Sequence, residues 1–370
     1  MSGDTGRPPP TTTEPPLSEE VAARRKGLRT GWTTGTCASA AAKAAAQWLV
    51  TGEAPATVEV GLPGGRRVEF PVEPEQPYRC VVVKDAGDDP DCTDGARLTA
   101  EVEPLDGETV IEAGDGVGVV TLPGLGLPVG APAVNPVPRR MILAALAEVT
   151  PLPLRVTLSV PGGEAMAAKT SNARLGIVGG ISILGTTGVV RPFSTAAYRA
   201  SVVQQIDVAA AQGQTTVALA TGSRSEAAAR RILPELPEVC LVEVGDFTGI
   251  ALRRAAAKGF DRVVFVGMVG KIAKLAAGVM MTHFHRSKVD TDLLAEVAAN
   301  AGVPPDVVAD ATATATARHF YERCTEAGHP EPLGVLCRMA ADACRAHAGG
   351  GLTVEVVMVD FEGDEVVARA

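Results

Sequence analysis

The residues best suited to chemistry in this chain lie in a loop of glycines, threonines and an arginine at positions 27–37. An alanine-rich stretch, 38–46, follows directly and predicts a helix. The loop would therefore present hydroxyls and backbone N–H groups at a helix N-terminus, where an anionic group is favoured. Thr34 and Thr36 are the candidate N-cap residues. The loop predicts either a cap alone or a cap that also binds an anion.

A second loop places five aspartates within residues 85–94, directly after an apolar strand pattern at 80–84. Packing alone gives little reason for so many carboxylates. They could bind a divalent cation, although the EF-hand spacing and its terminal Glu are absent, or accept hydrogen bonds from substrate N–H groups. An acidic surface turn is the third interpretation, since Asp, Gly and Pro also form turns. Of the functional alternatives, we expect hydrogen bonding rather than metal binding.

A third segment, 128–138, is rich in proline and ends at Arg139 and Arg140. Prolines stiffen a loop and keep it out of a sheet. A stiff loop ending in two arginines would suit a large flat substrate whose carboxylate arms are held in a bidentate manner. A rigid connector with solvated arginines fits the same pattern, so both interpretations stay open.

Histidines and cysteines give weaker signals. His283 and His285 could be general acid–base groups or metal ligands, but their alternate spacing does not fit a helical zinc motif. The seven cysteines show no CxxC pair and no Cys/His zinc spacing. We therefore expect no metal site, and free thiols in a reducing compartment.

Composition limits the class of protein. The net charge of −9 argues against a nucleic-acid partner, although it says little about a small anionic substrate. No apolar run reaches the ~18–20 residues of a membrane helix, and the N-terminus lacks a secretion signal. The sequence thus predicts a cytoplasmic protein that does not bind a membrane.

Two domains are expected to position these loops, because 370 residues are too many for one ordinary core. A tail precedes them. Residues 1–26, rich in Pro, Thr, Ser and Glu, predict a disordered tail. Residues 27–175 predict an α+β domain, with a hairpin of strands at 58–62 and 67–72. Residues 176–370 predict a three-layer, Rossmann-like α/β domain with a mostly parallel sheet.

The last of these predictions rests on strands that alternate with helices. The expected strands are 181–184, 216–220, 239–244 and 262–266. Glycine-rich segments follow these strands, and in open α/β sheets ligands bind at the carboxyl ends. None of the segments is a GxGxxG fingerprint or a P-loop, so each alone is a weak signal.

Together these segments resemble the cobalt-precorrin-5B C1-methyltransferase family of the anaerobic cobalamin pathway. The matching segments run in family order from about residue 28 to residue 290, and their joint specificity is high. They are 28–37, 84–91, 116–121, 128–139, 159–164, 174–188, 221–226 and 267–271.

The resemblance implies transfer of a methyl group from S-adenosylmethionine to ring carbon C1 of cobalt-precorrin-5B, giving cobalt-precorrin-6A. The substrate is then a wide, anionic corrinoid with acetate and propionate arms. The amino-terminal domain would bind it and the carboxy-terminal domain would bind S-adenosylmethionine. Homo-oligomerisation and a transient contact with other enzymes of the pathway stay open.

On this interpretation the site residues fall into three groups. The candidate catalytic residues are Asp85, Asp88 and His283. The candidate substrate-binding residues are Arg29, Thr33, Thr34, Lys84, Asn135 and Arg139. The candidate cofactor-binding residues are Gly185, Thr186, Thr187, Gly222, Ser223 and Asp246.

Two other functions compete with this one. A non-catalytic tetrapyrrole carrier or scaffold would need the substrate loops but no nucleoside site. A phosphotransferase would use the aspartates of 85–94 for magnesium and the glycine-rich loops for phosphates, but no phosphate-binding Lys/Ser signature is present.

Overall fold

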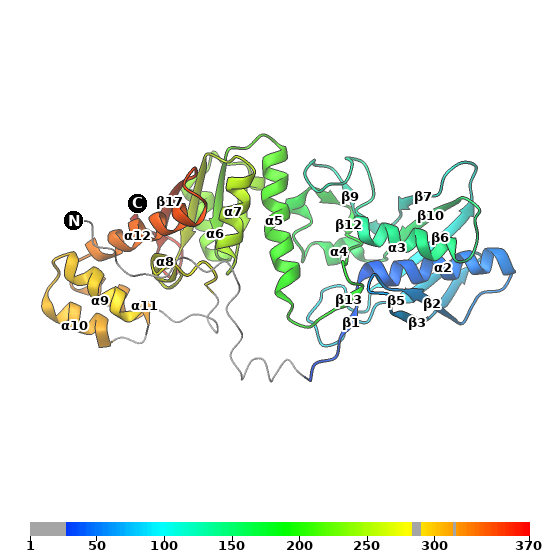
Figure 1. The fold of residues 1–370 in the computed structure, drawn as a ribbon, viewed down its shortest axis with the longest axis horizontal. Helices are drawn as coiled ribbons and strands as arrows, with labels where there is room; N and C mark the ends of the chain where they lie inside the picture. The colour runs from blue at the N-terminus through cyan, green and yellow to red at the C-terminus, as the bar shows by residue number, and fades with distance from the viewer. Residues whose placement is uncertain (1–26, 283–289, 314–315) are drawn as a thin grey trace. The chain divides into compact units, whose positions relative to one another are not determined.

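The computed structural model describes residues 27–282, 290–313 and 316–370. Within these ranges the chain forms two units that divide between Ala197 and Tyr198, in the first turn of helix α5, Thr195–Ala211 (Figure 1). The architecture is mixed α/β, with both antiparallel and parallel strand pairs.

The amino-terminal unit is built on a five-stranded sheet in the order β4-β5-β6-β10-β7. Its strands are β4 Glu73–Gln76, β5 Arg79–Val83, β6 Arg97–Pro104, β7 Val110–Ala113 and β10 Leu154–Ser159. All pairs are antiparallel except β10 with β7, which is parallel. The predicted hairpin is confirmed as β2, Thr57–Gly61, paired with β3, Arg67–Pro71.

Helix α2, Thr34–Thr51, is the centre of this unit's core. Every residue from Thr34 to Ala46 is buried, because the helix lies between the sheet on one side and helix α3, Pro136–Ala147, on the other (Figure 1). A helix buried all round is built mainly of small and apolar residues, and alanine lets its neighbours approach closely. The alanine run therefore forms the interior, and the loop before it is fixed by the helix start.

Short strand pairs bring residues 177–190 into the amino-terminal unit. Strand β12, Gly180–Ile181, runs parallel to β8, Gly116–Val117, and β11, Ile177–Val178, runs antiparallel to β9, Val119–Val120. Strand β13, Val189–Val190, pairs with β1, Gly31–Trp32. The strand predicted at 181–184 is thus not part of the parallel sheet, and the division of the chain lies after Ala197 rather than at 175/176. Short segments α4, Gly163–Ala167, and η1, Ala173–Leu175, complete this part.

Glycines allow these strand pairs to form. A Cβ on Gly180 would lie 2.0 Å from the carbonyl oxygen of Gly116, and one on Gly163 would lie 2.1 Å from the same atom. Gly116 itself has a φ of +71°, and a Cβ on it would lie 1.9 Å from the carbonyl oxygen of Val160. Backbone thus packs directly on backbone, a contact that no larger residue permits. The pairing that holds 177–190 depends on this approach.

The carboxy-terminal unit has a five-stranded sheet in the order β15-β14-β16-β17-β18. Its strands are β14 Thr216–Ala220, β15 Leu241–Glu243, β16 Arg262–Gly267, β17 Thr353–Val359 and β18 Val366–Arg369. The first four are parallel and β18 is antiparallel to β17. The alternation predicted from 216 to 276 is confirmed, with α6 Ser223–Ile232, η2 Glu238–Cys240, α7 Thr248–Ala257 and α8 Val269–Ala276 between the strands.

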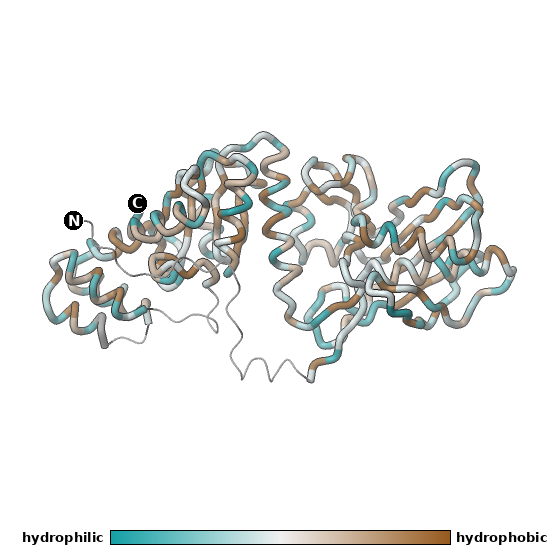
Figure 2. The backbone as a smooth tube through the Cα atoms, viewed as in Figure 1, coloured by the Kyte–Doolittle hydropathy of each residue, from teal (hydrophilic) through white to brown (hydrophobic). Residues whose placement is uncertain are grey.

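Alternate residues of the strands pack on opposite faces of this sheet. Ala218 and Val264 face helix α6, whereas Val217, Leu219 and Phe265 belong to the larger core with α5, α7 and α8. The remaining helices of this unit also pack on the larger core, and Figure 2 shows their apolar faces as brown bands alternating with teal. They are α9 Thr291–Asn300, α10 Pro305–Ala313, α11 Ala317–Glu326 and α12 Glu331–His347. No helix in the described ranges has the length and apolar character needed to cross a membrane.

An ion network fixes the hairpin to the helices of the amino-terminal unit. Glu148, at the end of α3, receives two hydrogen bonds from the Arg67 guanidinium, at 2.8 and 3.1 Å, and also pairs with the buried Lys43 of α2. Arg67 and then Lys43 hold the pKa of Glu148 down to about 2, from its ordinary value of 4.5. Bidentate geometry and a buried partner make this network stronger than an ordinary surface pair.

We expect the Glu148 network to make stability fall in acid. A carboxylate whose pKa is lowered on folding stabilises the fold above its ordinary pKa, and this contribution is lost as pH falls from 4.5 toward 2. Because Glu148 is 38% exposed, solvent screening reduces the contribution to about 1 kcal/mol. Urea unfolding at pH 7 and pH 3 measures it. Glu148→Gln should lose about 1 kcal/mol less than the wild type over this range, and equal losses would contradict the assignment.

Candidate functional site

The loop before α2 is held against the acidic loop by backbone contacts. Trp32 N donates to Asp85 O at 2.8 Å, and Asp88 N donates to Arg29 O at 3.0 Å. Gly31 lies so close to Ala86 that a Cβ would be 2.1 Å from its carbonyl carbon. The structure thus brings together two of the loops that the sequence analysis treated separately.

Arg29, Asp85 and Asp88 form the exposed part of this junction. The guanidinium of Arg29 pairs with Asp85, and its backbone N–H donates to Asp88 Oδ2 at 2.6 Å. The Arg29 hydrogen bond, helped by the Gly87 N–H, lowers the pKa of Asp85. A carboxylate stabilised in this way is a poor proton acceptor. Asp85 is therefore poorly suited to the role of a base.

The interpretation that five aspartates exceed what packing explains is wrong. Each of the five accepts a hydrogen bond within the amino-terminal unit: Asp85 from Gly87 N, Asp88 from Arg29 N, Asp89 from Phe193 N, Asp91 from Thr93 N and Asp94 from Ala86 N. The loop needs these carboxylates because its turns leave backbone N–H groups that no strand satisfies. Their number alone is then no sign of chemistry.

Lys84 does not line a surface that a substrate could reach. Its residue is 2% exposed and its ammonium group donates to Asp91 Oδ2 at 2.8 Å, within the acidic loop. Burial raises the cost of ionising Asp91, but Lys84 and Thr93 outweigh it and lower the pKa of that carboxyl. The predicted substrate contact of Lys84 is therefore corrected to an internal ion pair. Lysine after a strand usually points to solvent, so the pattern of residues around Lys84 carries no signal of its burial.

The threonines of the first loop hold a neighbouring loop. Thr33, not Thr34 or Thr36, is the N-cap of α2 and accepts a hydrogen bond from Thr36 N. Thr34 Oγ1 accepts from Leu184 N at 2.9 Å, and Thr36 Oγ1 donates to Gly188 O at 2.8 Å. Thr33 and Thr34 are 6% and 4% exposed. Their hydroxyls serve the protein's own backbone, so we assign them a positioning role rather than direct contact with a ligand.

Gly185, Thr186 and Thr187 belong to this cluster and not to the parallel sheet. A Cβ on Gly185 would lie 2.4 Å from Thr33 Oγ1, so the loop packs directly on the start of α2. The prediction that these three residues share a sheet edge with Gly222, Ser223 and Asp246 is corrected, because they lie outside that sheet and in the other unit. We call the surface formed by residues 29–34, 85–89 and 184–188 the loop cluster.

Asn135 and Arg139 stand at the start of α3. Asn135 is the N-cap by backbone geometry, and no side-chain cap is formed. Prolines at positions 136 and 138 remove two of the N–H groups that a cap would satisfy. Asn135 N donates to Ile183 O at 3.0 Å, which places the residue beside the loop cluster. Arg139 and Arg140 are exposed.

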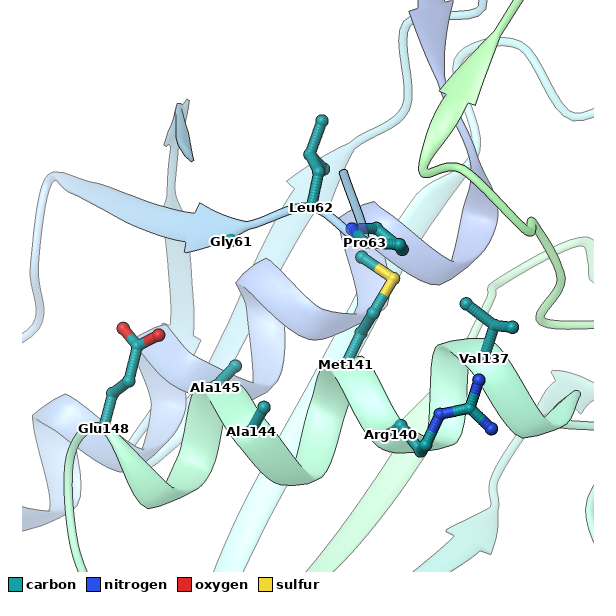
Figure 3. A pocket seen from close by; sticks show the side chains of 9 residues that line it. All are labelled: Gly61, Leu62, Pro63, Val137, Arg140, Met141, Ala144, Ala145 and Glu148. Atoms are coloured by element: carbon teal, nitrogen blue, oxygen red, sulfur yellow. The ribbon is translucent and has the colours of Figure 1, made fainter. Parts of the chain in front are cut away.

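A hollow of about 420 Å³ lies between α3 and the turn that follows β2. Figure 3 shows its lining: Gly61, Leu62 and Pro63 from the turn, and Val137, Arg140, Met141, Ala144, Ala145 and Glu148 from α3. Met141 points toward the turn, and the Arg140 guanidinium lies beside Val137 (Figure 3). Arg139 does not line this hollow.

The carboxy-terminal unit holds a second polar group, at the end of β15. Asp246 pairs with Lys271 of α8, and its Oδ1 also accepts from Thr282 Oγ1 at 3.3 Å. Lys274 is 6% exposed and donates to Thr282 O at 3.0 Å. Burial and then the charge of Lys271 lower the pKa of Lys274. Asp246 is among the predicted site residues, whereas Lys271 and Lys274 are not, because lysines in a helix pattern are usually solvated.

Gly222 and Ser223 follow β14, the strand beside β15. Ser225 Oγ accepts from Thr221 N at 2.9 Å and Gly222 N at 3.1 Å, which fixes the turn into α6. Gly222 has open space where a Cβ would be, and Ser223 is exposed. Strand order reverses between β14 and β16, so the carboxyl ends of these strands flank a topological switch point.

The third candidate catalytic residue, His283, lies outside the described residues, as does His285. Within the described ranges, no group of three or more His, Cys, Asp or Glu side chains could hold a metal ion. The structure thus offers two polar regions, one in each unit: the loop cluster and the carboxyl ends of β14 and β15.

Comparison with known proteins places the chain in a family. Residues 21–192 match the CbiD model, and residues 281–370 match the model of the CbiD C-terminal domain. The chain belongs to the CbiD family.

Its relatives are similar over nearly their whole length. A protein of Salinispora arenicola, named cobalt-precorrin-5B C(1)-methyltransferase, is 58% identical, over 98% of this chain and 97% of its own. Proteins of the same name from Rubrobacter xylanophilus and Thermus thermophilus are 58% and 49% identical, covering 96% and 93% of this chain and 95% and 94% of their own. A crystal structure of a cobalamin biosynthesis protein (cbiD) from Archaeoglobus fulgidus is 30% identical, covers 82% of this chain and 85% of its own, and has a TM-score of 0.40.

Proposed function

We propose that this chain is an enzyme of cobalamin biosynthesis that methylates C1 of cobalt-precorrin-5B, giving cobalt-precorrin-6A. The observation that carries the proposal is the 58% identity, over nearly the whole of both chains, to proteins named for this reaction. S-adenosylmethionine supplies the methyl group as an electrophile on a sulfonium. Transfer is an in-line displacement, so the protein contributes chiefly by positioning the two reactants.

We place the nucleoside of S-adenosylmethionine at the carboxy-terminal sheet, which would act as a Rossmann-like fold. The switch point between β14 and β16 is where such sheets bind ligands. Asp246 Oδ2 has no hydrogen-bond partner among the described residues, so it can accept from a ribose hydroxyl. Gly222 and Ser223 leave open space and exposed backbone beside it. These residues fit the chemistry of a nucleoside.

We place the corrinoid at the loop cluster of the amino-terminal unit. Arg29 and Asn135 offer a cation and an amide to the carboxylate arms, and Thr186 and Thr187 are exposed beside them. Leu184, 46% exposed, supplies an apolar surface in the same loop. An arginine among exposed apolar and hydroxyl groups complements a flat ring with anionic arms. We therefore propose that Gly185, Thr186 and Thr187 lie at the substrate rather than at the cofactor.

Replacing Asp88 and replacing Asp85 should change different kinetic parameters, because only Asp88 is proposed to accept a proton. We expect Asp88→Asn to lower kcat about a hundredfold, the usual contribution of a general base. Asp85→Asn should chiefly raise the KM for the corrinoid, because Asp85 positions the Arg29 guanidinium that binds the carboxylate arms. Steady-state kinetics with both variants measure this split. A normal kcat in Asp88→Asn would exclude it as the proton acceptor.

The function is tested by incubating the protein with cobalt-precorrin-5B and S-adenosylmethionine that carries a ¹³C-labelled methyl group. A product heavier by one labelled methyl, with its NMR signal at C1, is the expected result. A label at another ring position would overturn the assignment of the reaction. If calorimetry showed corrinoid binding without any binding of S-adenosylhomocysteine, the chain would be a tetrapyrrole carrier instead.

A further inference from the structure

We propose that the hollow between α3 and the turn at 61–63 is a subsite for one alkyl-carboxylate arm of the macrocycle, whose carboxylate binds Arg140. This inference rests on the proposed function and names a residue for it. The sequence pattern selected Arg139 for this role, but only Arg140 lines the hollow.

The charge is available because Arg140 has no partner of its own. Among the described residues it makes no hydrogen bond or ion pair, whereas Arg29 and Arg67 are both held by carboxylates. Its guanidinium lies beside Val137, toward the start of α3 (Figure 3). Helical side chains lean toward the N-terminus in this way. A planar guanidinium can then bind an incoming carboxylate through two N–H groups.

The lining suits the methylene groups of an arm. Pro63 of the turn lies across the hollow from Met141 of α3, and Leu62 and Val137 complete the apolar lining (Figure 3). These side chains offer apolar surface on both sides, while the polar groups stand at the ends. A ligand with alkyl groups and one terminal carboxylate matches this arrangement.

The opposite end of the hollow sets the direction of the arm. Glu148 stands eight residues after Arg140, about 12 Å along the helix axis. Arg67 and Lys43 keep it ionised, since they hold its pKa near 2. Because these two cations already have carboxylate partners, Arg140 is the cation of the lining that is available to the anionic end of the ligand.

The hollow adjoins the loop cluster within the same unit. A Cβ on Gly188 would lie 2.8 Å from Leu62 Cδ2, and one on Gly35 would lie 2.6 Å from Pro138 Cγ. The turn that forms one wall therefore touches the 184–188 loop, and the first turn of α3 touches the start of α2. A ring bound at the loop cluster could place an arm in the hollow.

The test compares Arg140→Gln with Arg139→Gln, and uses Arg338→Gln as a control for the loss of an exposed arginine elsewhere. Arg338 is an exposed residue of α12 in the other unit. We expect Arg140→Gln to raise the KM for cobalt-precorrin-5B at least tenfold with kcat nearly unchanged. The rise in this KM caused by Arg139→Gln should be at least fivefold smaller than the rise caused by Arg140→Gln. Arg338→Gln should have the KM of the wild type. Equal effects of Arg139→Gln and Arg140→Gln would overturn the proposal.

A second variant tests the hollow without changing its charge. Ala144 is exposed and lines the hollow, so Ala144→Phe should fill it without disturbing the core. We expect the same rise in KM, with an unchanged melting temperature. Binding of cobalt-precorrin-5B, followed by its absorbance, separates the two proposals. If the wild type bound the corrinoid more tightly than Arg140→Gln but transferred no methyl group, the subsite would be retained and the proposed reaction would be overturned. A wild-type KM in Ala144→Phe would exclude the hollow.

Discussion

Replacing Lys84 with methionine should lower the free energy of unfolding by about 3 kcal/mol, because it breaks a buried ion pair and leaves one partner behind. The Lys84 side chain is 1% exposed and its Nζ lies 2.8 Å from Asp91 Oδ2. Methionine keeps the length of the side chain but cannot donate to the carboxylate. Asp91 would keep only its hydrogen bonds from Thr93. Urea unfolding at neutral pH measures the loss.

The double variant Lys84→Met/Asp91→Asn distinguishes an ion pair from simple packing. It removes both charges, so its stability should recover most of the loss of the single variant. A structural role also predicts that any active Lys84→Met protein keeps a KM for the corrinoid close to that of the wild type. A large rise in KM in a well-folded variant would restore the substrate contact that the sequence suggested.

Local periodicity was enough to predict the elements that depend on it. The hairpin of β2 and β3 is joined by Pro63, Gly64 and Gly65, and its strands alternate as a half-buried pair should. The strands and helices from Thr216 to Ala276 likewise follow from apolar runs separated by amphipathic stretches. Such signals lie within a few residues of the element they describe.

The parts that failed depend on contacts between distant segments. Residues 177–190 carry apolar runs like those of the later strands, yet they pair with β8, β9 and β1 because Gly116 and Gly180 allow their backbones to meet. Lys84 is buried because Asp91 lies opposite it, and nothing at position 84 alone reveals this. The same holds for Lys271, whose partner Asp246 is found on another strand end.

The sequence therefore predicted which loops form the candidate site more accurately than it predicted the role of each residue in them. The loops at 29–34 and 85–89 do meet, which their separate patterns did not require. Within them the buried threonines and the more exposed aspartates hold the backbone, and the guanidinium of Arg29 is exposed. Burial, which decides between a structural and a binding role, is a property of the folded chain and not of the motif.

Replacing Asp246 with alanine should raise the apparent KM for S-adenosylmethionine about 10- to 100-fold, the usual effect of losing a hydrogen bond to a charged group. Asp246 is the carboxylate at the end of β15, and its Oδ2 stands ready to accept because Lys271 and Thr282 use only Oδ1. The KM for cobalt-precorrin-5B should stay near that of the wild type, since we place the corrinoid in the other unit. Steady-state kinetics with each reactant varied in turn measure both values.

Two further variants serve as controls for Asp246→Ala. Asp261→Ala removes an exposed carboxylate just before β16, at the opposite end of the sheet, and should behave as the wild type. Lys271→Met removes the partner of Asp246 but leaves its Oδ2, so it should raise the KM for S-adenosylmethionine less than Asp246→Ala. If Asp246→Ala and Asp261→Ala gave the same KM, the carboxylate would have no part in nucleoside binding. The switch point would then have to act through Gly222 and Ser223 alone.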